Sequence, residues 1–380
     1  MVGGAGGGVA LRGGLQAAGR LPELGWRGGG AGARDPPPRP LCPARRRDDP
    51  HPGSLLRLRA QHGGREVITR DQVEALEIHL GEALDDPCKL LRTDRMSMGQ
   101  SRAMYLAELE CETSGRRKVV IRVEQWGLLG SDSRDEVRVM RALHAAGLPV
   151  AGVLSYDPSC EILGQPFFVM DFVEGTSVFT RESLDPYVEA IAGLHALDFA
   201  ALGIDFFDLP SGPRDSALLQ VERWYEVYRG DLVGEPSPLV EEAAQWLRNH
   251  APETRQVSLV HGDPGPGNYL HEGGELRALV DWEFTHLGDA EEDWAYLIAM
   301  RGMGVMDEEA WVAYLAEKVG VDLDRDRLAY WIALNLFKGA CIDQTALGIF
   351  VRREVLAPNL LAIGTCIHLS ALKRLADTIF

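Results

Sequence analysis

The chain has 380 residues, of which 46% are hydrophobic, and a formal net charge of −17. This length and apolar content are enough for two regions with cores of their own, which excludes a protein that is disordered throughout. The acidity argues against nucleic acid as the main partner, and it suits either a surface that attracts cationic substrates or the ordinary acidic exterior of a cytoplasmic protein.

A membrane protein and a cysteine-based metal or disulfide site are also disfavoured by the sequence. No window approaches the 18 or so unbroken apolar residues that a membrane span needs, so we expect no membrane partner. The six cysteines are scattered without a C-x-x-C pair, and we expect them to be reduced. Nothing in the sequence indicates an oligomeric state.

Residues 1–64 are rich in Gly, Pro and Arg and nearly free of aromatic and β-branched residues. Such a segment cannot bury enough apolar area to offset its ordering entropy. No compact apolar run precedes a small-residue cleavage site, so a secretory signal is not expected. We predict a disordered tail that the fold does not need.

Ordered structure is predicted over residues 65–171, beginning with a helix announced by Thr69 as N-cap and Gln72 three residues later. Residues 105–111 and 118–124 alternate apolar and polar side chains, the period of half-buried strands, and the turn between them makes an antiparallel hairpin. A helix follows from Ser133 and Glu136 to Gly147. Two further apolar runs, in 150–157 and 166–175, read as strands.

Helical patterns dominate residues 172–380. They cover 187–197, 218–228, 238–250, 307–320, 327–342 and 367–380. Only the region 257–282 interrupts them with short apolar strands. The predicted fold is therefore α+β, with a small N-terminal β-rich lobe over 65–171 joined near 172–175 to a larger α-helical lobe.

A polar cluster lies in "VSLVHGDPGPGNYL", residues 257–270. His261, Asp263 and Asn268 follow a short buried strand and therefore lie on a loop. The later run "LRALVDWEF" predicts a second strand that ends in Asp281 and Glu283, whose side chains, two residues apart, would face the same side. Two carboxylates and an amide supply oxygen ligands of the kind that Mg²⁺ takes together with substrate phosphates.

"HGDPGPGN" followed by "DWE" resembles the H-G-D-x-x-x-x-N and D-x-E motifs of the aminoglycoside phosphotransferase family, which includes choline kinase-like enzymes and has a protein-kinase-like fold. The resemblance implies that Asp263 orients and deprotonates a substrate hydroxyl. It implies that Asn268 and Asp281 hold Mg²⁺ and that Glu283 supports the metal or a bound water. The alternative is a capped structural loop.

Two more residues, His261 inside this motif and Asp293 after it, have two interpretations each. His261 either braces the loop by hydrogen bonding or titrates in the reaction. Asp293 resembles a family acid that braces the site, and it could also be the N-cap of the helix that follows.

The resemblance also implies an ATP site in the smaller lobe. Gly99, Gln100 and Ser101 stand where the family has a loop over the phosphates, although one glycine between strands is also an ordinary turn. Met170 and Phe172 lie in the linker whose backbone meets adenine.

"VVIR" looks like the kinase V-A-I-K strand, with Val120 against adenine and Arg122 toward the α- and β-phosphates. An arginine in the place of the usual lysine can still hold phosphate oxygens. Lys118, on the same side of the strand, is the less suited substitute. Glu136 either pairs with Arg122 or is a capping-box acid.

The acceptor pocket should face Asp263 from the helical lobe. Polar and aromatic candidates occur at helical spacing, with the aromatic stripes more typical of a core and Asn335 and Lys338 facing either the pocket or water. The candidates are Trp224, Tyr225, Tyr228, Tyr330, Trp331, Asn335 and Lys338.

The sequence thus predicts a cytoplasmic kinase that moves the γ-phosphate of ATP, with Mg²⁺, to a hydroxyl of a small molecule. The acceptor alternatives are an aminoglycoside, a choline-like amino alcohol, a sugar or a hydroxyacyl compound. A different class is a nucleotide-binding regulator without turnover, because Arg122 replaces lysine and the loop at Gly99 has few glycines.

Overall fold

The structure is a computed structural model that describes residues 70–96, 102–124, 133–353 and 358–380. The predicted tail, the N-cap Thr69 and the phosphate-loop candidates Gly99, Gln100 and Ser101 lie outside these residues.

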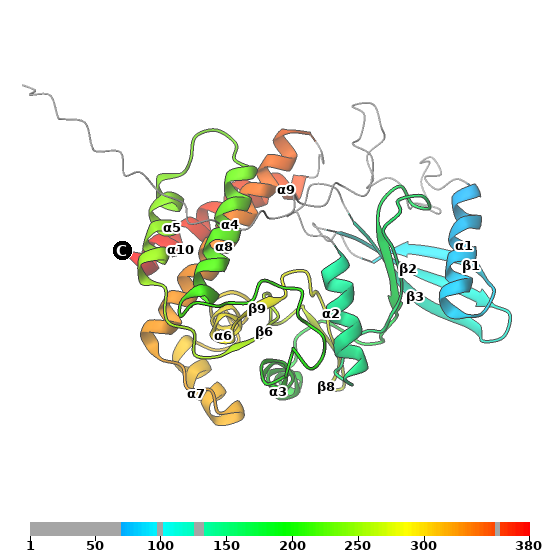
Figure 1. Cartoon of the computed structure of the whole chain (residues 1–380), viewed down its shortest axis with the longest axis horizontal. Helices are drawn as coiled ribbons and strands as arrows, with labels where there is room; N and C mark the ends of the chain where they lie inside the picture. The colour runs from blue at the N-terminus through cyan, green and yellow to red at the C-terminus, as the bar shows by residue number, and fades with distance from the viewer. Residues whose placement is uncertain (1–69, 97–101, 125–132, 354–357) are drawn as a thin grey trace, which may run out of the picture. The chain divides into compact units, whose positions relative to one another are not determined.

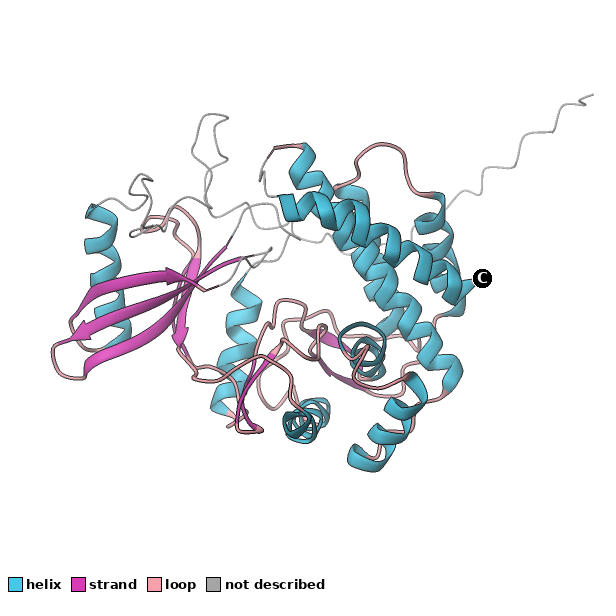
Figure 2. Ribbon diagram, turned by 180° about the vertical axis from the view of Figure 1, so that it is seen from behind, coloured by secondary structure: helices cyan, strands magenta, loops and turns pink. Residues whose placement is uncertain are grey.

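One five-stranded antiparallel sheet occupies the N-terminal part of the described chain (Figure 2). Its strands are β1 (Cys88–Arg95), β2 (Arg102–Cys111), β3 (Gly115–Glu124), β4 (Val153–Asp157) and β5 (Phe167–Asp171), in the order β1-β2-β3-β5-β4. The predicted hairpin is confirmed: β2 and β3 pair with Tyr105 opposite Ile121. Strand β1 was not predicted.

The two faces of β3 have different partners because its side chains alternate. Val119, Ile121 and Val123 are buried in one apolar cluster with Leu76 and Leu80 of helix α1 (Arg70–Leu84), which lies against this face of the sheet (Figure 1). The opposite face of the strand carries Val120 and Arg122. The predicted alternation is therefore confirmed, and it directs those two residues away from the α1 core.

Helices make up most of the remaining chain. They are α2 (Ser133–Ala145), α3 (Leu184–His195), α4 (Asp215–Gly230), α5 (Pro238–His250), α6 (Glu291–Tyr296), α7 (Glu308–Val319), α8 (Arg325–Val351), α9 (Pro358–Ala362) and α10 (His368–Ile379). A short 3₁₀ turn, Arg181–Ser183, precedes α3, and two π-helical turns, η3 (Leu297–Arg301) and η4 (Ile363–Ile367), follow α6 and α9. The predicted α+β architecture is confirmed.

Capping residues explain where several helices begin and end. The carboxylates of Asp307 and Asp324 accept backbone N–H bonds at the starts of α7 and α8, at 2.8 and 3.0 Å. Helix α7 ends at Val319 and is followed by Gly320, whose φ of 69° lies in the left-handed region that glycine tolerates best.

Tryptophan and tyrosine side chains fill the centre of the helical part. Trp224, Tyr228, Tyr330 and Trp331 are all at most 3% exposed. The prediction that these aromatic stripes belong to the core is confirmed, whereas Tyr225 is half-buried and donates a hydrogen bond to Glu241 at 2.7 Å.

Two small two-stranded antiparallel sheets position the polar motif. Strand β6 (Val257–Val260) pairs with β9 (His286–Asp289), and β7 (Tyr269–Glu272) pairs with β8 (Glu275–Leu279). The predicted strand through Asp281 and Glu283 is wrong, because β8 ends at Leu279 and Asp281 has a φ of 71°. The loop after β6 and the loop after β8 instead meet directly, with the amide of Val280 donating to the carbonyl of Asn268 at 3.1 Å.

Within the described residues, no helix is both long and apolar enough to span a bilayer. Cys88, Cys111, Cys341 and Cys366 are free thiols, as predicted. Cys160 is disulfide-bonded, which contradicts the prediction for that residue, because pairing depends on proximity in space that sequence spacing does not give.

Candidate active site

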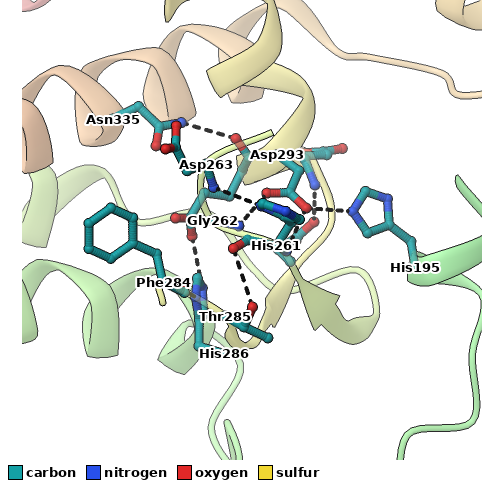
Figure 3. A network of polar contacts seen from close by, with 12 residues as sticks. His195, His261, Gly262, Asp263, Phe284, Thr285, His286, Asp293 and Asn335 are labelled. Atoms are coloured by element: carbon teal, nitrogen blue, oxygen red, sulfur yellow. Dashed lines mark hydrogen bonds and ion pairs between the residues drawn. The ribbon is translucent and has the colours of Figure 1, made fainter. Parts of the chain in front are cut away.

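The loop after β6 is held by a single buried carboxylate. The two oxygens of Asp293 accept the backbone N–H groups of His261 and Gly262, each at 2.8 Å, and one of them also contacts Nε2 of His195 at 2.8 Å (Figure 3). Burial alone would raise the pKa of Asp293, but the His195 hydrogen bond and charge hold it below its ordinary value. Asp293 lies inside α6, whose N-cap is Ala290, so the N-cap interpretation is wrong and the bracing contacts are present.

His261 uses both ring nitrogens within the protein. Nδ1 lies 3.3 Å from the amide nitrogen of Asp263, which donates to it, and Nε2 lies 3.1 Å from the carbonyl of Val280. A carbonyl can only accept, so the hydrogen-bond network assigns the proton to Nε2 of a neutral ring. Burial lowers the pKa of His261, in agreement with that assignment. These contacts favour bracing over titration.

Gly262 sits where two loops nearly touch. Its φ is 85°, and a Cβ on this residue would lie 2.5 Å from the carbonyl oxygen of Phe284. Only glycine fits this approach without displacing the chain. The close contact places the motif loop against the loop that carries Asp281 and Glu283.

Asp263 is bound by an arginine that the sequence did not indicate. Nε and Nη2 of Arg301 donate to its two carboxylate oxygens at 2.7 and 2.5 Å, a bidentate geometry. The side-chain nitrogen of Asn268, Nδ2, donates to one of the same oxygens at 2.7 Å. Arg301 ends η3, and the only signal for it in the sequence is a cation that follows an apolar run.

The glycines of the motif make room for Arg301. A Cβ at Gly265, where φ is 137°, would lie 2.5 Å from Cβ of Arg301, and one at Gly267, where φ is 100°, would lie 3.2 Å from its Nη1. The Gly and Pro spacing between Asp263 and Asn268 therefore lets the loop pass over this guanidinium.

Arg122 lies near three carboxylates from two segments, helix α2 and the loop after β8. It lies 2.9 Å from Glu136, 3.1 Å from Asp281 and 3.6 Å from Glu283. Burial opposes its charge, but the three acids outweigh burial and raise its pKa. The predicted contact between Arg122 and Glu136 is present. Asp281 and Glu283 both lie near this arginine, although no strand carries them.

Lys118 takes a different position. Its Nζ lies over the ring of Phe172, 5.3 Å from the centroid. It does not line the cavity that Arg122 lines. Of the two cations proposed for phosphate, Arg122 is the one beside the motif.

A cavity of about 370 Å³ separates the sheet from the motif. Val120, Met170 and Phe172 line its apolar part, and Arg122, Asn268 and Asp281 line its polar part. A mostly apolar pocket with a few convergent polar groups is the usual form of a small-molecule site, and this size lies in the usual range. The residues expected around a nucleotide, apart from those outside the described chain, thus surround or adjoin one cavity.

The donor set at the polar end fits a divalent cation. The amide nitrogen of Asn268 is bonded to Asp263, so its Oδ1 is the atom that can ligate. Asp281 is 34% exposed and Glu283 only 6%, so Asp281 is the accessible carboxylate. In the described chain no cluster of three or more His, Cys, Asp or Glu is placed to hold a metal. Mg²⁺ is usually bound by one or two carboxylates together with substrate phosphates and water.

The chain matches a model of the phosphotransferase enzyme family over residues 97–331. Among curated proteins, acyl-CoA dehydrogenase family member 10 of Mus musculus is 31% identical over 247 residues, which cover 60% of this chain and 22% of that protein. Acyl-CoA dehydrogenase family member 11 of Rattus norvegicus is 26% identical over 325 residues, covering 73% and 41%. The chain therefore spans less than half the length of these relatives.

Solved structures with the same fold include a candidate aminoglycoside phosphotransferase of Ralstonia eutropha JMP134, at 23% identity and a TM-score of 0.60, covering 80% of this chain and 97% of that one. A thermostable mutant of aminoglycoside phosphotransferase APH(4)-Ia, in ternary complex with AMP-PNP and hygromycin B, aligns with a TM-score of 0.54 at 19% identity, covering 80% and 98%. Choline kinase LicA of Streptococcus pneumoniae aligns with a TM-score of 0.55 at 15% identity, again covering 80% and 98%.

Proposed function

The chain belongs to the phosphotransferase enzyme family, and on this basis we propose that it moves the γ-phosphoryl group of ATP to a hydroxyl of a small molecule, with Mg²⁺ as its metal. The observation that carries the proposal is the convergence of Asp263, Asn268 and Asp281 from two loops beside one cavity. The ATP analogue bound by the APH(4)-Ia relative supports ATP as the donor.

The cavity divides into parts that suit the parts of ATP. Val120 and Met170 would contact the adenine ring, and Arg122 would hold phosphate oxygens. The pair that Glu136 forms with Arg122 keeps the guanidinium on this face of β3. The Asp281 carboxylate pairs with Arg122 in this structure, so a bound phosphate would compete with Asp281 for the N–H groups of Arg122.

Asn268 and Asp281 would hold Mg²⁺, which supplies charge neutralisation of the transferring phosphate when it is bound. Carboxylates gather around two guanidinium groups at this end of the cavity: Glu136, Asp281 and Glu283 lie around Arg122, and Asp263 binds Arg301.

Asp263 would take the proton of the acceptor hydroxyl. As the bond from the acceptor oxygen to γ-phosphorus forms, the bond from phosphorus to the leaving oxygen of ADP breaks, and the hydroxyl proton passes to the Asp263 carboxylate. Arg301 and Asn268 fix the orientation of that carboxylate, which is how positioning contributes to the rate.

The acceptor belongs to one of four classes: an aminoglycoside, a choline-like amino alcohol, a sugar or a hydroxyacyl compound. The hygromycin B complex and the choline kinase relative exemplify two of them. A regulator that binds nucleotide without turnover is the second candidate function. It is favoured by the three carboxylates that lie within 3.6 Å of Arg122, where a phosphate would otherwise bind.

Consumption of ATP by the purified chain, with a pooled metabolite mixture and Mg²⁺, tests the proposal. We expect ATP to be consumed faster with the pool than without it, and a phosphorylated product to appear only for protein with Asp263 intact. If Mg²⁺ and ATP raise the melting temperature but no acceptor class is phosphorylated, the regulator is favoured over the kinase.

A further inference from the structure

Lys338 lies in the middle of α8 and is almost completely enclosed, with a side chain only 2% exposed. The rings of Trp224, Phe284 and Tyr296 surround its Nζ at 5.3, 5.0 and 5.2 Å. Burial lowers the pKa of this ammonium. It is buried, so the interpretation that it faces water is wrong, and it does not line the nucleotide cavity.

The polar partner of Lys338 is a backbone atom of the motif loop. Its Nζ donates to the carbonyl oxygen of Gly262. The nearest carboxylate oxygen, Oε1 of Glu292, is 3.8 Å away, too far for a good hydrogen bond. Asn335, one turn earlier in α8, donates to the carbonyl of Glu292 at 3.0 Å and ties the same helix to α6.

Gly262 is thereby fixed at both of its polar backbone atoms. Its N–H donates to Asp293 at 2.8 Å, and its carbonyl accepts from Lys338. The peptide unit that starts at this carbonyl contains the amide nitrogen of Asp263. The direction of Asp263, the next residue, therefore depends on where Lys338 holds that peptide unit.

Packing alone does not account for a lysine at this place. The neighbours of Lys338 are aromatic rings, and an apolar side chain of similar length would fill the same space without placing a charge in a low-dielectric interior. Such a side chain would lose the bond to Gly262, together with the longer ion pair to the buried carboxylate of Glu292.

We propose that Lys338 is a positioning residue for Asp263, acting through the Gly262 carbonyl. The inference rests on the proposed function, in which Asp263 is the base. Lys338 does not contact substrate in this account, and it acts by keeping the motif loop in one conformation under Arg301.

The substitution Lys338→Met tests the inference, because methionine keeps the unbranched shape and removes the donor. We expect amide hydrogen exchange in residues 257–270 to become at least about tenfold faster, since the loop opens locally. We expect kcat to fall roughly 10- to 100-fold, since small misplacement of a base has effects of this size, while KM for ATP stays within about threefold.

Two controls separate positioning from general stability. Leu336→Ala removes a buried side chain from the same helix that cannot hydrogen-bond to Gly262, and Lys318→Met makes the same chemical change at an exposed site. Unchanged exchange in 257–270 for Lys338→Met would overturn the inference, as would an equal fall in kcat for Leu336→Ala. If the wild-type chain consumes no ATP, the proposed function fails, and the exchange measurement still decides whether Lys338 holds the loop.

Discussion

Both carboxylates that the proposed reaction needs are paired with an arginine in this structure. Arg301 binds Asp263 through two hydrogen bonds, and Arg122 binds Asp281 at 3.1 Å. These pairs have different consequences. The first orients a base and can persist during the reaction, whereas the second must loosen before Arg122 can hold a phosphate and Asp281 a metal.

At residue scale, the sharpest prediction concerns Asp263. Asp263→Asn removes the base and keeps the shape, so we expect turnover to fall by about 10²- to 10⁴-fold while ATP affinity changes little. Steady-state rates and calorimetric binding on the same preparation check both halves. A variant with near-normal turnover would remove Asp263 from the role of base.

Arg301 can be tested separately from the base that it holds. Arg301→Met removes both arginine bonds to Asp263 and keeps the bond from Asn268, and the loss of charge-assisted bonds worth about 1.5 to 3 kcal/mol predicts a roughly 10- to 100-fold lower kcat. ATP affinity should remain, because Arg301 does not line the nucleotide cavity. Equal losses in kcat and in ATP affinity would show that the arginine supports the fold rather than the base.

At the scale of single elements, the contact between the two loops is the feature most sensitive to substitution. Gly262→Ala combines a positive φ with a Cβ 2.5 Å from the Phe284 carbonyl, so the loops must separate. We expect a large loss of thermal stability and of Mg²⁺-dependent ATP binding.

Gly320→Ala is the matched control, since Gly320 also has a positive φ but nothing lies within 4 Å of its Cβ position. Gly320→Ala should lower the free energy of unfolding by only about 1 kcal/mol, the cost of placing alanine in the left-handed conformation, and should leave ATP binding unchanged. Similar effects of the two substitutions on binding would mean that the close approach at Gly262 has no role in the site.

Local patterns predicted the elements that bury one face. The hairpin of β2 and β3, the helices of the C-terminal part and the orientation of Val120 and Arg122 follow from periodicity and caps. Strand β1 was missed because its run "CKLLRTDR" is an edge strand with mostly polar, exposed side chains. The assignment of a strand to Asp281 failed because an apolar run does not show where strand pairing stops.

The site was predictable where it lies in one motif and not where distant segments contribute. "HGDPGPGN" and "DWE" identified Asp263, Asn268 and Asp281 as candidates, but Arg301 and the buried contact of Lys338 come from turns and helices that only the fold brings to the loop. A cation inside an apolar run was the available signal, and it is ambiguous without the tertiary contacts.

At the scale of the whole molecule, one buried acid should shape the pH dependence of stability. Asp343 is 7% exposed, and burial raises its pKa to about 7 from 3.8. The native state therefore binds this proton more tightly than the unfolded state, so stability attributable to Asp343 falls as pH rises from about 4 to 7 and stays low above that.

Asp343→Asn removes the loss of stability that comes from ionising this buried carboxyl group. We expect it to raise the free energy of unfolding more at pH 8 than at pH 5, by about 2 to 3 kcal/mol, because the unfolded carboxyl is ionised at both values and the native one only at the higher. Denaturant unfolding at the two pH values provides the measurement. An equal effect at both would mean that Asp343 ionises normally in the fold.

The account depends on a divalent cation held between Asn268 and Asp281 beside the cavity, and calorimetric titration of ATP tests this most directly. For the wild-type chain we predict binding that strengthens at least about tenfold when Mg²⁺ replaces EDTA, and for Asp281→Asn we predict that most of this dependence disappears. Binding that is the same with and without Mg²⁺, or a Mg²⁺ effect that survives Asp281→Asn unchanged, would contradict the proposed site.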